Sequence, residues 1–223
     1  MDRFWLLRKP DSAPLAEHDH DKMRSVPIIC PLEEGHRRGG KRLTGLSVTL
    51  SSGRPPDFVW TWNSDLMAQA PAIAFLHEHG LTGFATHPVN ARFVKRSSSP
   101  PPKLWELQIL GWGGMAVEKA GISVVEYCPS CLHKKFKVER PQNLVDPEQW
   151  DGSDFFMVWP LPRHIFISDR AATLLRDARL TGLKIIPATS IPPPIVGTYT
   201  PGRLSHWMPM DRAEALGRKF DIV

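Results

Sequence analysis

The sequence is poor in cysteine and has no long run of apolar residues. Three cysteines in 223 residues are too few for a disulfide framework, so we expect a reducing compartment. Nowhere do about 18 apolar residues follow one another, and the N-terminal apolar run, Phe4 to Leu7, is too short for a signal peptide. We therefore expect a cytoplasmic protein with no membrane partner.

Signatures of catalysis are also lacking. The sequence contains no Gly-x-Ser-x-Gly nucleophile elbow, no His-Glu-x-x-His zinc motif and no Gly-x-Gly-x-x-Gly dinucleotide loop. Nine histidines are present, but no nucleophile and base converge in any recognised pattern. We expect a protein that is not an enzyme and has no catalytic residues. The alternative hypothesis is an enzyme with an unrecognised site. It requires a polar pocket that contains a titratable group with a perturbed pKa.

The composition is that of a globular protein with short elements. Hydrophobic residues make up 42% and charged residues 23%, which argues against general disorder. The 22 prolines, clustered for example between Ser190 and Ile195, exclude an architecture of long helices. The net charge of +5 permits an acidic partner, but only the segment from Gly35 to Arg42 is densely basic, and a solvated loop is the simpler interpretation of it.

The segment from Trp150 to Ala188 has the clearest secondary-structure pattern, and it predicts a strand, a helix and another strand. Phe155 to Trp159 and Ile165 to Ile167 are aromatic and β-branched, as strands are. Ser168 and Asp169 can cap a helix, and apolar residues follow at helical spacing until Gly182 ends it. Leu183 to Ile186 then predicts a buried strand that ends at Pro187.

The remaining elements are less distinct. A helix is expected from Ser64 to His79, capped by Ser64, with Pro71 marking a kink or a late start. Gly111 to Gly114 is expected to form a turn, and Asp211 to Leu216 a short terminal helix. Further strands are predicted at Phe4 to Leu7, Leu46 to Leu50, Phe58 to Trp62, Ala85 to Val89, Leu104 to Leu110 and Ile122 to Tyr127.

One segment of the chain recurs. Phe75 to Val89 and Leu174 to Ala188 align without a gap, sharing a Leu-Thr-Gly turn and a proline five residues after the glycine. Each copy uses a glycine to end a helix and a proline to end a strand. We predict a single α+β domain over residues 1–223, with mixed sheets, a few short helices and a duplicated helix-turn-strand unit, in halves of about 1–103 and 104–223.

Cysteine spacing indicates a metal site. Cys128-Pro-Ser-Cys131 has the spacing of a zinc knuckle, and Cys30-Pro-Leu-Glu33 repeats it with a glutamate in place of the second thiol. We expect Cys30, Cys128, Cys131 and either His36 or Glu33 to hold one structural zinc ion. A knuckle that folds without metal is the alternative, and a thioredoxin-like pair is less favoured because a strand is expected after Cys131.

The segment from Trp150 to Asp154 has two interpretations. Asp-Gly favours a tight turn whose Asp and Ser side chains satisfy backbone N–H groups. Alternatively, Trp150, Asp151 and Asp154 present an exposed indole and two carboxylates to a binding partner. The tight turn is the preferred interpretation, although the two interpretations are compatible.

Taken in order, these motifs resemble the double-CxxCG motif family of myxobacterial and other proteobacterial proteins. The likeness extends over nearly the whole chain. It includes the two cysteine boxes, by which we mean Cys30 to Glu33 and Cys128 to Cys131, and also Gly111 to Gly114, the WDGSDFF strand and both Leu-Thr-Gly turns. The chain departs from the family at Glu33 and at Leu132, where the family has cysteine and glycine, so the family's zinc ligands carry over to Cys30, Cys128 and Cys131.

The resemblance implies a function, because some members of that family are immunity proteins. We accordingly expect a non-enzymatic binding protein that neutralises a cognate bacterial toxin by direct contact. The alternative is a zinc-ribbon-like nucleic-acid-binding or regulatory protein, which the cysteine pair and the basic pI of about 9.3 permit.

Overall fold

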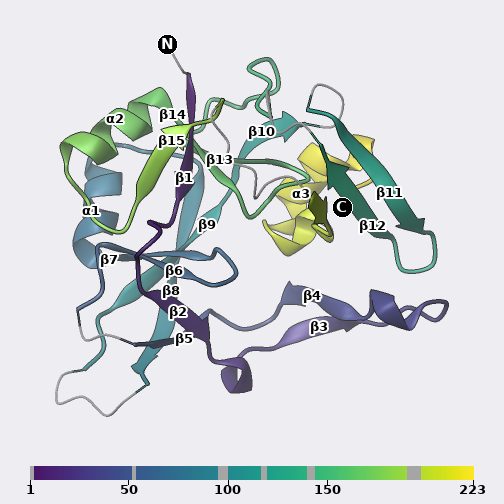
Figure 1. Ribbon diagram of the computed structural model, residues 1–223, viewed down its shortest axis with the longest axis horizontal. Coiled ribbons are helices and arrows are strands. Elements are labelled where there is room, and N and C mark those ends of the chain that lie inside the picture. The colour runs from purple at the N-terminus through teal and green to yellow at the C-terminus, as the bar shows by residue number, and fades with distance from the viewer. Residues whose placement is uncertain (1–2, 52–53, 95–99, 117–119, 140–143, 190–196) are drawn as a thin grey trace.

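The computed structural model describes residues 3–51, 54–94, 100–116, 120–139, 144–189 and 197–223. In these segments the chain forms a six-stranded closed barrel, a five-stranded sheet, a three-stranded sheet and a separate two-stranded hairpin, with three short α-helices (Figure 1). The predicted α+β class with mixed sheets is thereby confirmed. The proline cluster from Ser190 to Ile195 lies outside the described residues.

The strands that build these sheets have the following bounds. They are β1 (Phe4–Arg8), β2 (Leu15–His18), β3 (Ser25–Ile28), β4 (Arg38–Arg42), β5 (Ser47–Leu50), β6 (Phe58–Thr61), β7 (Leu66–Gln69), β8 (Phe84–Phe93), β9 (Leu104–Ile109), β10 (Gly111–Met115), β11 (Ile122–Cys128), β12 (His133–Val138), β13 (Phe155–Trp159), β14 (Ile165–Ser168), β15 (Lys184–Pro187) and β16 (Gly197–Tyr199). The barrel order is β2-β5-β8-β9-β7-β6, and the five-stranded order is β10-β13-β14-β1-β15.

The three α-helices agree with the sequence at two of three starts. Helix α2 (Asp169–Asp177) begins as predicted, because the Ser168 hydroxyl accepts a hydrogen bond from the backbone N–H of Ala171. Helix α3 (Met210–Gly217) includes the predicted terminal helix. Helix α1 (Ala70–Glu78) starts six residues after the predicted cap, because the apolar residues just before it form strand β7.

The predicted cap, Ser64, therefore has a different role. Its φ of 68° places it in the left-handed region, in a turn where its N–H donates to the carbonyl of Thr61. A residue in that conformation cannot start an α-helix. Pro71 marks the late start that was one of its two predicted meanings, since it stands in the first turn of α1, where a missing N–H costs nothing.

The expected turn at Gly111 to Gly114 is also wrong. These residues form β10, which pairs in parallel with β13. A Cβ atom on Gly111 would lie 2.1 Å from the carbonyl oxygen of Phe155, and one on Gly113 would lie 2.6 Å from the Phe156 ring. The glycines thus allow two strands and an aromatic core to approach closely, which a glycine-rich sequence alone cannot distinguish from a turn.

The barrel and the five-stranded sheet share one strand pattern. In the five-stranded sheet β1 lies between β14 and β15, with Trp5 opposite Ile167 and Pro187. In the barrel β9 lies between β7 and β8, with Trp105 opposite Ala68 and Pro88. Pro88 and Pro187 are aligned in the sequence repeat described above. Ala68 and Ile167 lie outside the repeat but at the same offset in the sequence, so the register is the same in both sheets.

The two halves exchange their first strands. β1 opens the N-terminal half but pairs with β14 and β15 of the C-terminal half. β9 opens the C-terminal half but pairs with β7 and β8 of the N-terminal half. The exchange relates the two halves symmetrically, and the duplication of the helix-turn-strand unit stays a prediction.

The two Leu-Thr-Gly corners are also reciprocal. Both the N–H and the hydroxyl of Thr82 donate to the Asp154 carboxylate, and both these groups of Thr181 donate to Asp57. A Cβ on Gly83 or Gly182 would lie 2.0 Å from a carbonyl oxygen of the opposite half. Each corner thus packs against the Asp-Phe pair at the start of a strand in the other half, which is Asp154-Phe155 for one corner and Asp57-Phe58 for the other.

One apolar core lies between the halves. It joins aromatic residues of β6 and β13 to alanine and leucine side chains of α1 and α2. Because both halves contribute to it, they fold against each other. No helix in the described segments is long and apolar enough to cross a membrane.

Candidate metal centre

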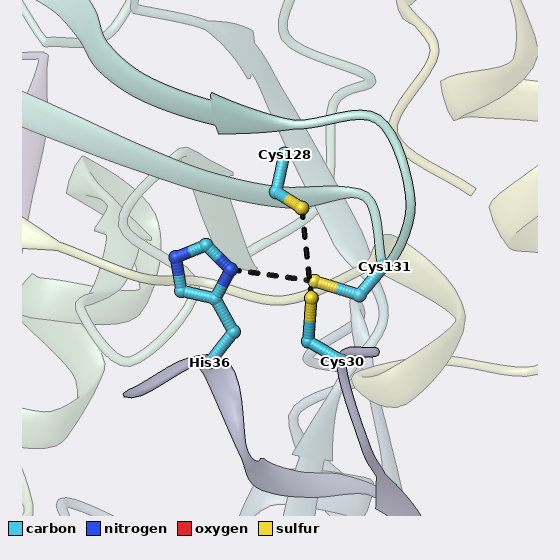
Figure 2. A group of neighbouring side chains, drawn as sticks. All are labelled: Cys30, His36, Cys128 and Cys131. Atoms are coloured by element: carbon cyan, nitrogen blue, oxygen red, sulfur yellow. Dashed lines mark hydrogen bonds between the residues drawn. The ribbon is translucent and has the colours of Figure 1, made fainter. Parts of the chain in front are cut away.

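Two hairpins from different halves meet at their tips. The β3–β4 hairpin carries Cys30 and His36 in its connecting loop. In the β11–β12 hairpin Cys128 is the last residue of β11, and Cys131 lies in the turn that follows. The hairpins reach the same side of the molecule in Figure 1, and Figure 2 shows the four side chains pointing toward one another. The loops around both cysteine boxes thus bring together residues about a hundred positions apart.

The spacing of the four donor atoms suits one ion. The sulfur atoms of Cys30 and Cys128 lie 3.7 Å apart, and Cys131 Sγ lies 3.7 Å from Nδ1 of His36. All four donor atoms lie within 4.8 Å of one another. Ligands held at about 2.3 Å from a tetrahedral zinc ion are themselves about 3.7 Å apart. The group can therefore hold a metal ion, and its three sulfurs and one nitrogen are a donor set that zinc prefers.

The electrostatics favour thiolates at the Cys128 box. Burial opposes ionisation of Cys131, but hydrogen bonds from Arg38 and from the backbone N–H of His133 lower its pKa to about 6. The backbone N–H of Cys131 lowers the pKa of Cys128 in turn. Burial raises the pKa of Cys30, so this thiol ionises last. The thiolate is the form that binds metal, and the site is thus partly prepared for it.

Arg38 supplies the positive charge next to the cluster. Its guanidinium lies 3.7 Å from Cys131 Sγ and donates to the carbonyl oxygens of Cys131 and His36 at 3.1 and 2.9 Å. Three thiolates and one neutral imidazole around a divalent ion leave one net negative charge, which Arg38 offsets. The basic segment from Gly35 to Arg42 is therefore not the solvated loop expected from the sequence: it forms η2 (Glu34–His36) and β4.

His36 is held by a second group of side chains. Its Nε2 lies 2.6 Å from Oε1 of Glu126, and its ring stacks on His133 with centroids 4.3 Å apart. The hydrogen bond with Glu126 raises the pKa of His36 and lowers that of Glu126. With Nδ1 facing the sulfurs, Nε2–H can donate to the carboxylate, the arrangement that orients many metal-binding histidines.

Three residues around the site were missed from the sequence. The ligands are surrounded by Arg38, Glu126 and His133. Of these three, only Glu126 could have been identified from a pattern in the sequence. It stands two positions before Cys128 in a predicted strand, and residues two apart in a strand point to the same face. Arg38 and His133 depend on how the hairpins meet, which no local pattern encodes.

Glu33 is not part of the cluster. Its carboxylate accepts a hydrogen bond from the N–H of Gly35 and caps the short η2 helix. Of the two predicted fourth ligands, the structure thus places His36 among the sulfurs. Cys128 ends strand β11 and is followed by a hairpin turn, whereas a thioredoxin-like pair opens a helix, so the less favoured redox interpretation has no structural basis.

The segment from Trp150 to Asp154 forms the predicted turn. Asp151 accepts from the N–H of Ser153, and the Trp150 indole N–H donates to the Ser153 carbonyl. Asp154 is buried and accepts hydrogen bonds from Thr82, Ser168 and Arg170.

The expectation of two exposed carboxylates beside an exposed indole is therefore wrong for two of the three residues. Asp154 faces inward to hold the corner at Thr82, and Trp150 is half-buried against Phe4. Asp151 is exposed, but it pairs with Arg212 at 2.7 Å.

Comparison with known proteins adds no assignment. No protein-family model and no curated protein matches this chain. The resemblance to the double-CxxCG motif family therefore stays a prediction, and the site must be interpreted from its own geometry.

Proposed function

We propose that the protein is a non-enzymatic binding protein whose two hairpins, fastened by one structural zinc ion, form the docking surface for a protein partner. The single observation that carries this proposal is where the exposed apolar side chains lie. Of the ten large hydrophobic residues exposed in the described segments, seven belong to these hairpins or directly follow one: Val26, Ile29, Leu32, Leu43, Val124, Val125 and Tyr127. We call these seven the apolar strip.

The exposure of this strip is costly unless it is covered. Ile29 and Leu32 are 69% and 72% exposed, and they flank Cys30 at the point where the hairpins meet. Exposed apolar side chains concentrated on one pair of hairpins, in a protein with a well-formed core, are typical of an interaction site. The apolar strip and the metal cluster share the same hairpins, so the ion also fixes the shape of the strip.

Zinc is supported by the chemistry of the ligands. Four protein donors complete a tetrahedral shell, whereas a catalytic zinc site keeps one position open for water. A closed shell has no place for substrate. In addition, two hollows in the described segments, one beside Leu15 and one beside Leu175, are lined by no His, Cys or carboxylate side chain.

Nucleic-acid binding is less well supported. The three lysines of β12 form ion pairs with Asp221, Glu126 and Glu139. Cations that are already paired contribute little to phosphate binding. Arg37 and Lys41 are exposed and form no ion pair with other described residues, but two cations release few counterions from a nucleic acid.

The specific role we propose is that of a toxin-neutralising immunity protein in the bacterial cytoplasm. The resemblance of the cysteine boxes and Leu-Thr-Gly corners to the double-CxxCG motif family supports it, and an exposed docking surface is what such a role requires. The partner is then a cognate toxin, bound without any chemical change.

Co-expression tests this proposal directly. The product of the adjacent gene is produced in a susceptible bacterium with and without this chain. We expect growth arrest without the chain, rescue with it, and a one-to-one complex on size-exclusion chromatography. A chain carrying Ile29→Asp and Leu32→Asp is expected to lose rescue, whereas Trp62→Asp, equally exposed but outside the strip, is expected to keep it. Rescue without a complex would contradict the proposal.

A further inference from the structure

Among the strands that the structure describes, none pairs with one of the two edges of β11. It lies at the end of the three-stranded sheet, in the order β11-β12-β16, and in the described segments it pairs only with β12. Its seven residues are long enough to accept another strand. An unpaired edge exposes N–H and C=O groups that proteins normally cover, shorten or protect with charge.

The side chains of β11 do not protect this edge. Val124, Val125 and Tyr127 are each about half exposed, at 49%, 50% and 49%. Val124 and Val125 are neighbours in the strand, so they place apolar surface directly beside the edge. The register shift between Val124 and Glu126 leaves both valines in solvent.

The loop of the β3–β4 hairpin extends this apolar surface. Ile29 and Leu32 lie on either side of Cys30, whose sulfur is 3.7 Å from that of Cys128, the residue after Tyr127. A strand added beside β11 would therefore end next to these two side chains. The metal cluster positions the edge and the apolar loop together.

Charge around this surface is positive. The two hairpins, residues 25–42 and 122–138, contain seven Lys and Arg residues against three Glu. Arg37 and Lys41 are exposed and form no ion pair with other described residues. The field extends inward: burial, followed by the charges of Arg203, Arg38 and Lys41, lowers the pKa of His206 to about 4. A second copy of this chain would bring the same positive charge against the edge, so self-association is disfavoured.

We propose that β11 receives an extended acidic segment of the partner protein, in which Asp or Glu alternates with apolar residues, as an added strand. Main-chain hydrogen bonds to the free edge would supply affinity, while the apolar strip and the exposed cations Arg37 and Lys41 would select the side chains. This inference rests on the proposed function and specifies the chemical class of the partner segment.

A peptide selection tests the inference with the protein as it exists. The zinc-loaded full chain is immobilised and exposed to a random library of peptides of about twelve residues displayed on phage. We expect enriched peptides in which acidic and apolar residues alternate. With such a peptide bound, hydrogen exchange is expected to slow at the amides of Ile122 to Cys128.

Variants identify which part of the surface binds. Val125→Glu and the double variant Arg37→Glu with Lys41→Glu are each expected to weaken binding of the enriched peptide about tenfold or more. Lys103→Glu reverses one exposed charge outside both hairpins and is expected to have no effect. Circular dichroism checks that all variants fold.

Several outcomes would overturn the inference. They are an absence of enriched peptides, enrichment of basic or uncharged ones, binding unaffected by Val125→Glu, tight binding of single-stranded nucleic acid at the same surface, and a concentration-dependent dimer of the chain. A toxin that binds the hairpins while leaving the β11 amides unprotected would remove this inference but preserve the proposed function.

Discussion

The Nε2 atom of His36 lies 2.6 Å from Oε1 of Glu126, although 90 residues separate the two in the chain. One comes from the β3–β4 hairpin and the other from β11, so this bond joins the same two hairpins as the metal ligands. A carboxylate in this position fixes which imidazole nitrogen carries the proton and which faces the metal.

Removing that carboxylate is expected to weaken zinc binding. We predict that Glu126→Ala lowers zinc affinity about 10- to 100-fold, because the His36 ring loses its orientation, and that Glu126→Gln, which still offers an acceptor, loses less. Competition with a chromophoric chelator measures both. Glu148→Gln, an exposed glutamate outside the hairpins, is expected to bind zinc normally. Equal affinities for Glu126→Ala and the parent would show that this bond does not orient the ligand.

Removal of the metal is expected to loosen the hairpins without unfolding the core. The β3–β4 hairpin pairs with no other described strand, and two-stranded hairpins are barely stable alone. Chelation is therefore predicted to speed hydrogen exchange at residues 25–42 and 122–138, while β13 and β14 stay protected. In the Cys131→Ser variant the hairpins are expected to exchange fast already, with no further effect of chelator. Global unfolding on chelation would contradict a local fastening role.

The glycines of the two Leu-Thr-Gly corners are expected to tolerate no side chain. We predict that Gly83→Ala and Gly182→Ala each destabilise the fold by more than about 3 kcal/mol, because the added Cβ would meet a backbone carbonyl oxygen at 2.0 Å. Gly152→Ala is a matched control: its φ of 87° is similar, but nothing lies within 4 Å. Its expected cost is only about 1 kcal/mol, from backbone strain. Urea denaturation compares all three.

Leu132 is expected to be a strained position. Its φ of 55° is left-handed, in the turn between Cys131 and His133. A leucine pays about 1 to 2 kcal/mol there, whereas glycine loses roughly 0.4 to 1 kcal/mol more chain entropy on folding. Leu132→Gly is therefore predicted to raise stability by about 0.5 to 1 kcal/mol, seen as a small rise in melting temperature. A fall in melting temperature would mean that packing of the leucine outweighs the strain.

His164 is expected to make the fold sensitive to acid. Burial, together with the charge of Arg8, lowers its pKa to about 4, and its buried Nδ1 has no hydrogen-bond partner among the described groups. Between pH 6.5 and about 4, His164 binds a proton in the unfolded chain but not in the folded chain. The unfolding free energy therefore loses nothing from this residue above pH 6.5 and decreases as the pH falls below it. The loss approaches roughly 3 kcal/mol.

His164→Gln is the variant that measures this effect. Its unfolding free energy is expected to fall less than that of the parent between pH 7 and pH 4.5. Both chains are compared in the Cys131→Ser background, since protonation of the thiolates would otherwise release metal over the same range. Identical pH profiles would mean that the pKa of His164 is the same in the folded and the unfolded chain.

Part of this structure could be predicted because the controlling interactions are local. The Ser168 cap, the glycine at the end of each corner and the tight turn at Asp151 follow from the conformations that single residues prefer. The cysteine boxes are also local, and the requirement of a tetrahedral ion for four donors predicts that distant boxes meet.

The errors occurred where contacts from elsewhere in the chain determine the local structure. Ser64 and Asp65 resemble a helix cap, yet pairing of β7 with β6 and β9 keeps the following residues extended. Gly111 and Gly113 resemble turn residues because the crowding against Phe155 and Phe156 leaves no local trace. The apolar run from Phe4 to Leu7 predicts a strand but not that its neighbours are β14 and β15, because the composition of a strand does not identify its partners.

The exchange of β1 and β9 has a consequence for how the chain can be divided. A cut between residues 103 and 104 would leave each piece with a sheet missing an internal strand and holding a loose strand that fits only the other piece. Neither fragment would be complete alone, and a mixture of the two would restore both sheets at once. The molecule is thus naturally suited to fragment complementation, with recovery of the whole serving as a signal that two fused proteins have met.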